Sequence, residues 1–370
     1  GAVDDRIAFS APVNMVSAYM QGGDDCENAP GLRAGTNNVE LAALMAPRPM
    51  FVVSATGDWT KHVPQEEFPA IQSIYKLYGK ADNVGVTQID APHNYNQKSR
   101  EAVEQFLGKT ILNSPSAGQF KEKSVPVEGL AEMLVWQGKS LPTDALNYKQ
   151  LFELWRQMAA RQVDAISEMD RLRDVLAVTV GVEWPTTVVD EKGKERDHIV
   201  LGRKGDGDTI PAYWRKRGKT AVLILDPEGL ETARKSVQTR RLMARNSVLI
   251  IDAFQTASAV ADRDRTAKHF LTFNHTDDTN RVQDVLTALR FLDQQHFTSI
   301  QVVASGKAAW WAEFASAIAP TTVKLKLELP ASSLVDTEEA FLANFNVPGV
   351  LRAGGLRTAD RLLKAADRIH

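Results

Sequence analysis

The chain has 370 residues, of which 44% are hydrophobic and 24% charged, and its formal net charge is −2. This is ordinary globular composition, and the near-neutral charge, with a sequence pI of about 6.4, argues against a nucleic-acid or membrane-surface partner. No apolar run is long enough to span a membrane, and the single cysteine, Cys26, excludes an internal disulfide. At roughly 100–200 residues per domain, this length predicts two domains.

The first third of the chain alternates between predicted strands and predicted helices. The strands are 7–13, 50–54 and 84–89, and the helices are 38–45, 66–79 and 98–111. Pro47 follows the first of these helices, and Gly79 ends the second. Such alternation predicts a mostly parallel sheet covered by helices.

The middle of the chain does not continue the alternation of strands and helices. Residues 113–146 form a connector with scattered Pro, Ser and Gly, and residues 147–176 are predicted to be helical. Seven apolar residues of the helical stretch fall largely on one stripe, as in an amphipathic helix: Leu151, Leu154, Trp155, Met158, Val163, Ile166 and Met169.

A second α/β domain is expected from residue 185. Strands 198–201 and 210–215 would pair around the turn Gly205-Asp-Gly-Asp208. Further strands are predicted at 220–225, 248–252, 300–303 and 323–329, and helices at 230–245, 279–294 and 308–318. The predicted organisation is therefore a first domain at 1–112, a connector and helical region at 113–184, and a second domain at 185–370.

Two polar residues follow two successive predicted strands of the first domain. Asp58 comes after the strand 50–54, on a turn with Gly57, and His93 comes after the strand 84–89. Functional groups in open α/β sheets lie beyond the carboxyl ends of strands, so both would lie at one edge of the sheet. A carboxylate there can orient an imidazole that takes a proton from a serine. Singly, each has a structural interpretation, as a capping aspartate or a packed loop histidine; together they match the order of acid and base in α/β-hydrolase triads.

The neighbouring motifs carry a family resemblance in combination. They are Ala2-Val-Asp-Asp-Arg-Ile7, Ala46-Pro-Arg-Pro-Met50, Ala55-Thr-Gly-Asp-Trp-Thr60 and His93-Asn-Tyr-Asn96. With them, residues 1–112 resemble the C-terminal half of acetyl xylan esterase-like α/β-hydrolases. In that family the aspartate of Gly-Asp-Trp-Thr is the triad acid and the histidine of His-Asn-Tyr-Asn is the base. The resemblance implies these roles for Asp58 and His93, and we expect Trp59 to line the substrate pocket.

The sequence departs from this family at the nucleophile. The family's serine sits in a Gly-x-Ser-Gly-Gly elbow just before the Ala-Val-Asp-Asp-Arg segment, which would be roughly ten residues upstream of Gly1 for a helix of ordinary length. The 370 residues hold no such elbow, and the nearest serines, Ser10 and Ser17, are interpreted as structural. We therefore expect the first domain to lack its N-terminal half. An export signal, if one existed, would also lie upstream. A periplasmic or secreted location is expected, with the cytoplasm as the alternative.

The second domain holds a segment placed as an elbow should be, between a strand and a helix. In Ile300-Gln-Val-Val-Ala-Ser-Gly-Lys-Ala-Ala309, the small residues Ala304 and Ala308 put Gly306 at the nucleophile position. Ser305 lies one residue too early. The segment resembles the degenerate second hydrolase-like domain behind some acetyl xylan esterase-like domains, so the chain is expected to hold tandem α/β-hydrolase-like sheets.

Other candidate sites have simpler explanations. The Gly205–Asp208 turn could suggest calcium but fits a hairpin turn better. His269, His275 and Asp277–Asp278 are too dispersed for a convincing metal cluster. Trp310 and Trp311 are expected to serve packing rather than a sugar platform. Neither a metal nor a cofactor is predicted.

The favoured function is part of a serine carboxylesterase that removes acyl groups from plant polysaccharide. The alternatives are a dipeptidyl-peptidase-like serine peptidase, which also uses a late Asp and His, and a non-catalytic binding or scaffolding protein, which the empty elbow favours for 185–370. The expected partners are an acylated polysaccharide or other small ester and the missing half of the same protein. The 370 residues alone are expected to be hydrolytically inactive.

Overall fold

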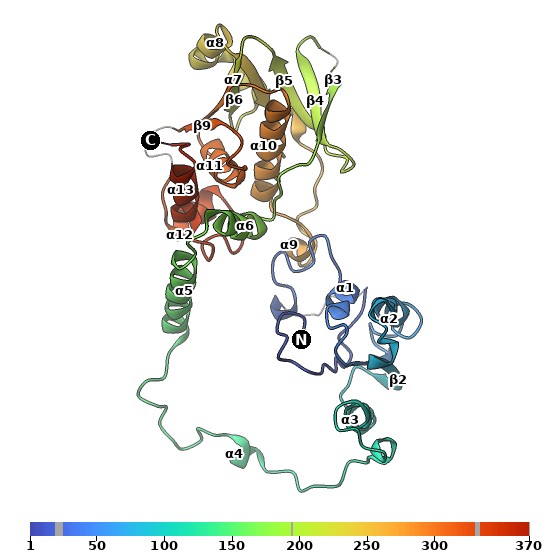
Figure 1. The fold of residues 1–370 in the computed structure, drawn as a ribbon. Helices are drawn as coiled ribbons and strands as arrows, with labels where there is room; N and C mark the ends of the chain where they lie inside the picture. The colour runs from blue at the N-terminus through green and yellow to red at the C-terminus, as the bar shows by residue number, and fades with distance from the viewer. Residues whose placement is uncertain (19–24, 194, 330–333, 370) are drawn as a thin grey trace. The chain divides into compact units, whose positions relative to one another are not determined.

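The structure, a computed structural model, describes residues 1–18, 25–193, 195–329 and 334–369 (Figure 1). The chain divides into two compact units. Unit 1 comprises Gly1–Thr143 with His269–Asn274, and unit 2 comprises Asp144–Lys268 with His275–His370.

Unit 1 contains two parallel strands and several helices. The strands are β1 (Met50–Gly57) and β2 (Val84–Pro92). The α-helices are α1 (Asn38–Ala43), α2 (Glu67–Leu77), α3 (Gln97–Thr110), α4 (Leu130–Met133) and α9 (Phe270–Phe273), with short 3-10 helices at Asp25–Glu27, Ala81–Asn83 and Ala117–Gln119. The strands and the three longer helices agree with the predicted ones to within a few residues.

The β1–β2 pair is covered on both faces because side chains alternate along a strand. Met50 and Val52 of β1 pack with Ile71 of α2, whereas Phe51 and Val53 pack on the other face with residues of α3. The Phe51 ring stacks on Phe106 of α3 with 4.6 Å between ring centroids. This is the layered α/β arrangement that the alternating pattern predicts.

The predicted strand 7–13 is only partly right. Ser10 and Val13 form isolated parallel bridges to Met50 and Val53 of β1, without becoming a regular strand. The residues from Ser10 to Val13 are half-buried rather than buried. Among the described residues this segment pairs with β1 alone, so its other edge does not join a ladder.

Unit 2 is larger, and its sheet contains both parallel and antiparallel strand pairs. Its strands are β3 (Val188–Lys192), β4 (His198–Arg203), β5 (Ile210–Arg215), β6 (Thr220–Leu225), β7 (Ser247–Ile251), β8 (Ser299–Ala304) and β9 (Leu325–Glu328). Its α-helices are α5 (Tyr148–Asp164), α6 (Met169–Val180), α7 (Leu230–Lys235), α8 (Val237–Met243), α10 (Asp277–Gln294), α11 (Ala308–Ile318), α12 (Glu338–Asn344) and α13 (Gly355–Ala365), with a 3-10 helix at Ala257–Ala259.

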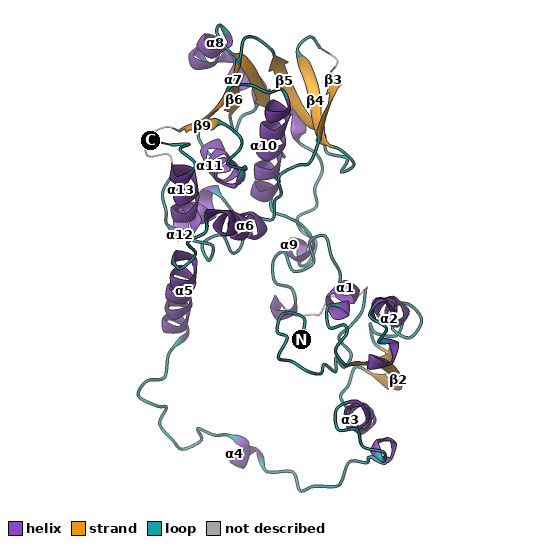
Figure 2. Ribbon diagram, viewed as in Figure 1, coloured by secondary structure: helices purple, strands orange, loops and turns teal. Residues whose placement is uncertain are grey.

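The described strands of unit 2 form one sheet in the order β3-β4-β5-β7-β6-β8-β9. The pairs from β3 to β7 are antiparallel, and the four strands β7-β6-β8-β9 are parallel. Leu223 and Leu249 belong to a large core shared with α10 and α11, whereas Val222 and Val248 belong to a smaller core with α7. Figure 2 shows these helices and the strands of the sheet. The α/β class of fold predicted from the sequence is therefore confirmed, but this sheet is mixed rather than parallel, because β3, β4 and β5 join it through antiparallel pairs.

Two predicted helices are each divided in two. The stretch 147–176 forms α5 and α6, with extended backbone at Glu168 between them. The stretch 230–245 forms α7 and α8, because Ser236 is extended and its side chain accepts a hydrogen bond from Thr239 N–H, which starts a new helix. Of the residues in α5, only Val163 is buried, so the predicted apolar stripe mostly does not face the core.

Within the described ranges, no helix has both the length and the apolar character that crossing a bilayer requires.

Candidate active site

The strand register brings Asp58 and His93 together at the carboxyl ends of β1 and β2. Ala55 pairs with Ile89, but Gly57 pairs with Pro92, so β2 gains one residue through a bulge. Continuing the shifted register places Asp58 opposite His93. The Nδ1 atom of His93 lies 3.1 Å from Oδ2 of Asp58, as the proximity prediction requires; their catalytic roles stay predictions.

Thr60 fixes the orientation of the Asp58 carboxylate. Backbone N–H of Thr60 donates to Oδ1 of Asp58 over 2.6 Å, and the Thr60 hydroxyl donates to the same oxygen. That hydroxyl in turn accepts a hydrogen bond of 3.0 Å from Ala55 N–H. Oδ1 is therefore occupied within its own turn, and Oδ2 is directed at the imidazole. The Asp58 side chain is 3% exposed, which strengthens these bonds by excluding water.

His93 presents its other ring nitrogen outward. Its side chain is 52% exposed, and Nδ1 is engaged by Asp58. In the described part of the chain, no hydrogen bond is made by Nε2 of His93. The loop that carries His93 is fixed, because Asn96 caps α3 by accepting from Ser99 N–H, and Asn94 accepts from Asn96 N–H over 2.9 Å. The imidazole is thus oriented by one carboxylate and open on its opposite edge.

Trp59 and Asn14 complete the surroundings of the pair. The Trp59 ring lies 4.6 Å from the His93 ring, centroid to centroid, and its Nε1 donates to the carbonyl of Asn14 over 3.0 Å. Asn14 is buried, and its side-chain amide donates to the Asn94 carbonyl. The indole therefore forms one side of the space beside His93, and its role in substrate binding stays a prediction.

Sequence reasoning missed two contributors, Thr60 and Asn14. Thr60 lies inside the quoted Gly-Asp-Trp-Thr motif, and a hydroxyl two residues after an aspartate is a recognised turn partner. Asn14 has a positive φ of 56°, a conformation in which Asn is enriched. It was not detectable beforehand, because its contacts are made with residues far along the chain.

Ser10 and Ser17, interpreted from the sequence as structural, are not positioned to react with His93. Ser10 pairs with Met50, at the opposite end of β1 from Asp58. Ser17 is fully buried, and its hydroxyl donates to the Trp59 carbonyl over 3.0 Å. Among the described residues, neither serine forms a hydrogen bond with His93.

The segment of unit 2 interpreted from the sequence as an elbow lies between β8 and α11. Gly306 in this strand-to-helix turn adopts a left-handed φ of +51°, and its role as a degenerate elbow stays a prediction. Ser305, one residue earlier, donates its hydroxyl hydrogen bond to Asp226 over 2.9 Å. Among the described residues, no hydrogen bond joins Ser305 to a histidine that could act as its base.

The remaining sequence candidates have structural partners. Arg203 bonds both carboxylate oxygens of Asp208 across the hairpin turn. Nδ1 of His269 lies 3.7 Å from Oδ1 of Asp25. Trp310 and Trp311 are both buried, as predicted for packing residues. The described residues include no cluster of three His, Cys, Asp or Glu side chains arranged to hold a metal ion. The side chain of Cys26 lies outside the described atoms.

No protein-family model matches the chain, and no curated protein matches it. Three similar solved structures illustrate the likeness. Methylesterase BT1017 is 40% identical, with a TM-score of 0.29, over 31% of this chain and 27% of that one. A CE15 glucuronoyl esterase from Caldicellulosiruptor kristjansonii is 16% identical, with a TM-score of 0.26, over 34% and 43%. A protein from Bacteroides fragilis assigned as an acetyl xylan esterase is 10% identical, with a TM-score of 0.35, over 62% and 83%. The chain therefore spans well under two thirds of the length of the first two of these structures.

Proposed function

We propose that this chain supplies the acid and the base of a serine ester hydrolase, and that the nucleophilic serine comes from a part of the protein outside these 370 residues. The observation that carries the proposal is the 3.1 Å contact between Nδ1 of His93 and Oδ2 of Asp58. It leaves Nε2 of His93 directed away from the acid, which is the geometry that a proton acceptor for a serine hydroxyl needs.

Each residue has a definite part in the proposed reaction. Nε2 of His93 takes the hydroxyl proton as the serine oxygen attacks the acyl carbonyl, and Asp58 stabilises the imidazolium that forms. The imidazolium then protonates the departing alcohol, leaving an acyl-enzyme. A water molecule attacks this ester, with His93 accepting its proton and returning one to the serine, which releases the acid.

The substrate class follows from the motifs around these residues. The Gly-Asp-Trp-Thr and His-Asn-Tyr-Asn stretches resemble those of acetyl xylan esterase-like hydrolases, so we propose an acylated polysaccharide of acetyl xylan type. Unit 2 is proposed to be non-catalytic, because Gly306 stands where its nucleophile would be.

The test uses the parent protein, including the segment that precedes Gly1. Hydrolysis of acetylated xylan and of nitrophenyl acetate is measured for the native protein and for His93→Ala and Asp58→Asn. We expect kcat to fall by about 10⁴-fold or more in each variant, as for other serine triads. Native kcat in both variants would refute the proposal.

A peptide nitroanilide serves as the comparison substrate in the same assay. We expect no turnover of the peptide. His93-dependent cleavage of the peptide but not of the esters would point to a serine peptidase instead.

A further inference from the structure

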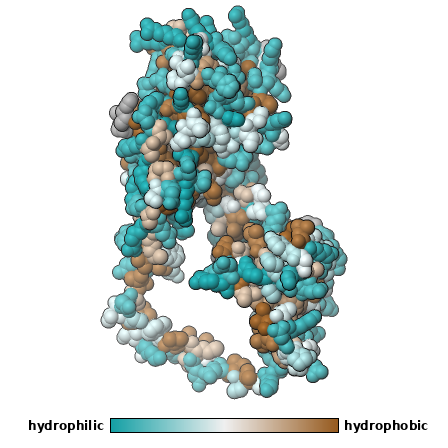
Figure 3. Space-filling model, viewed as in Figure 1, coloured by the Kyte–Doolittle hydropathy of each residue, from teal (hydrophilic) through white to brown (hydrophobic). Residues whose placement is uncertain are grey.

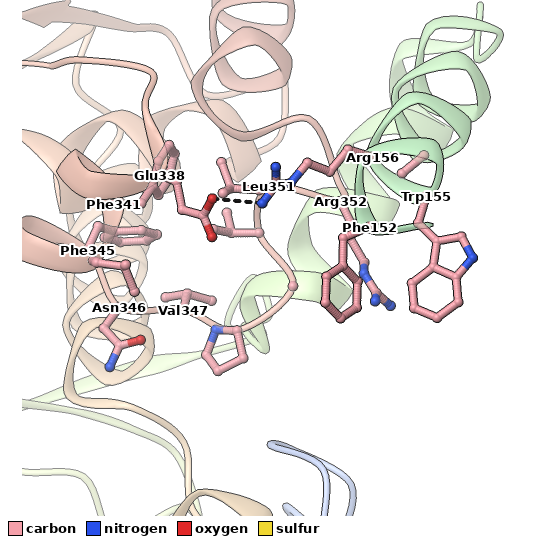
Figure 4. A pocket seen from close by; sticks show the side chains of 15 residues that line it. Phe152, Trp155, Arg156, Glu338, Phe341, Phe345, Asn346, Val347, Leu351 and Arg352 are labelled. Carbon is pink, nitrogen blue, oxygen red and sulfur yellow. Dashed lines mark hydrogen bonds and ion pairs between the residues drawn. The ribbon is translucent and has the colours of Figure 1, made fainter. Parts of the chain in front are cut away.

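Unit 2 contains a cavity of about 710 Å³ between α5, α12 and the loop that follows α12 (Figure 4). Its floor is formed by buried apolar side chains, namely Phe341, Phe345, Val347 and Val350. Its rim is formed by exposed ones, namely Phe152, Trp155, Leu342 and Leu351. Cavities that hold small organic ligands are typically about 300–1,000 Å³ with mostly apolar walls, so this one has suitable size and lining.

The aromatic residues on the rim are about half exposed rather than buried in the core. Phe152 and Trp155 are 49% and 47% exposed, and Trp155 belongs to the apolar stripe that the sequence predicts for this helix, α5. They lie three residues apart on one helix face, and both line the cavity. Hydrophobic residues are visible along α5 in Figure 3. Exposed apolar clusters of this kind commonly mark binding sites.

The charges at the cavity distinguish between kinds of ligand. It is lined by two arginines and one carboxylate, which are Arg156, Arg352 and Glu338. Arg156 donates to Glu338 over 3.0 Å, so these two charges compensate each other. Within the described ranges, the guanidinium of Arg352 has no ion pair or hydrogen bond to another side chain, and Figure 4 shows Arg352 among the side chains that line the cavity. Among the described residues that line the cavity, Arg352 therefore contributes a positive charge without a side-chain partner, and Phe152 and Trp155 contribute exposed aromatic rings.

We propose that this cavity binds an organic anion with a flat apolar body, namely an aromatic carboxylate. The aromatic body would contact Phe152 and Trp155, and the carboxylate would accept hydrogen bonds from Arg352. Guanidinium groups match carboxylates through two parallel hydrogen bonds, and apolar burial supplies the remaining affinity. The site lies wholly in unit 2 and does not depend on the proposed esterase reaction.

Isothermal titration of the 370-residue chain with 2-naphthoate tests the proposal. We expect saturable binding that Arg352→Gln weakens at least about ten-fold, the equivalent of one charge-assisted hydrogen bond pair. Trp155→Ala should also weaken binding, through lost apolar contact. Arg196→Gln is the matched control, because Arg196 is 96% exposed in unit 2 and does not line the cavity. The control should bind 2-naphthoate as tightly as the native chain.

Two further arms make the result decisive. The neutral analogue 2-naphthalenemethanol should bind the native chain at least about ten-fold more weakly than 2-naphthoate does. Arg352→Lys keeps the charge but loses the paired hydrogen bonds, so its affinity should fall between the native chain and Arg352→Gln. Circular dichroism confirms that each variant is folded. The proposal is overturned if 2-naphthoate does not bind, if folded Arg352→Gln binds it as the native chain does, or if the neutral analogue binds equally well. The last result would favour an uncharged ligand or an apolar protein segment.

Discussion

Thr60→Val tests whether the turn after β1 holds the triad acid. Valine has nearly the shape of threonine but lacks the hydroxyl that donates to Oδ1 of Asp58 and accepts from Ala55 N–H. The variant loses one charge-assisted hydrogen bond, worth about 1.5–3 kcal/mol, and leaves a buried N–H unpaired, at about 1–3 kcal/mol. Because Thr60 is fully buried, water cannot replace either bond. We therefore expect the free energy of unfolding to fall by about 3 kcal/mol or more.

Urea denaturation of the 370-residue chain, followed by circular dichroism, measures this loss. Thr60→Ser is the control, since it keeps the hydroxyl and should lose no more than the contacts of one methyl group. In the parent protein, Thr60→Val should also lower esterase kcat by about ten- to a hundred-fold through misorientation of Asp58. The reasoning is refuted if Thr60→Val is as stable as Thr60→Ser and retains native kcat.

Two further predictions concern stability. Burial, and to a smaller extent the charge of Asp360, raises the pKa of Glu313 from 4.5 to about 7. The Glu313 carboxyl therefore keeps its proton to a higher pH in the folded state than in the unfolded state. As a result, the free energy of unfolding of the native chain falls as pH rises from about 4.5 to 7. Because the amide introduced by Glu313→Gln does not titrate, the stability of this variant relative to the native chain should improve by about 3 kcal/mol between pH 4 and pH 8. Urea titrations at both pH values measure this change. The same stability difference between variant and native chain at pH 4 and pH 8 would contradict the prediction. Gly57→Ala places a Cβ 3.0 Å from the Ala91 carbonyl oxygen and should lose about 1–3 kcal/mol by displacing the end of β2. Gly118→Ala, whose Cβ would meet nothing within 4 Å, is its control, and equal unfolding midpoints would count against the bulge argument.

The sequence predicted the elements of this protein where a local pattern determines them. The strands β1 and β2 are apolar runs between turn signals, and the Gly205–Asp208 hairpin is marked by its glycines. From the order of strand and loop alone, Asp58 and His93 could be expected at one edge of a sheet. Strand ends are fixed by chain direction, so this inference needed no tertiary detail.

Features that depend on tertiary contacts were not predictable in this way. The bulge that places Asp58 opposite His93 arises from a one-residue shift in β1–β2 pairing, which neither strand reveals by itself. The apolar stripe of residues 147–176 was predicted from its periodicity, but a periodic pattern does not say what covers the stripe. In the structure, Trp155 of this stripe lines a cavity. The break at Ser236 was likewise missed, because serine is tolerated within helices and also caps them.

The most direct test of the central proposal is to identify the serine that His93 serves. The parent protein is treated with a fluorophosphonate, which forms a stable adduct with an activated serine, and the labelled peptide is located by mass spectrometry. We predict a single labelled serine that lies outside these 370 residues, with labelling lost in His93→Ala. Labelling of Ser10, Ser17 or Ser305, or labelling at any serine that persists in His93→Ala, would contradict the account.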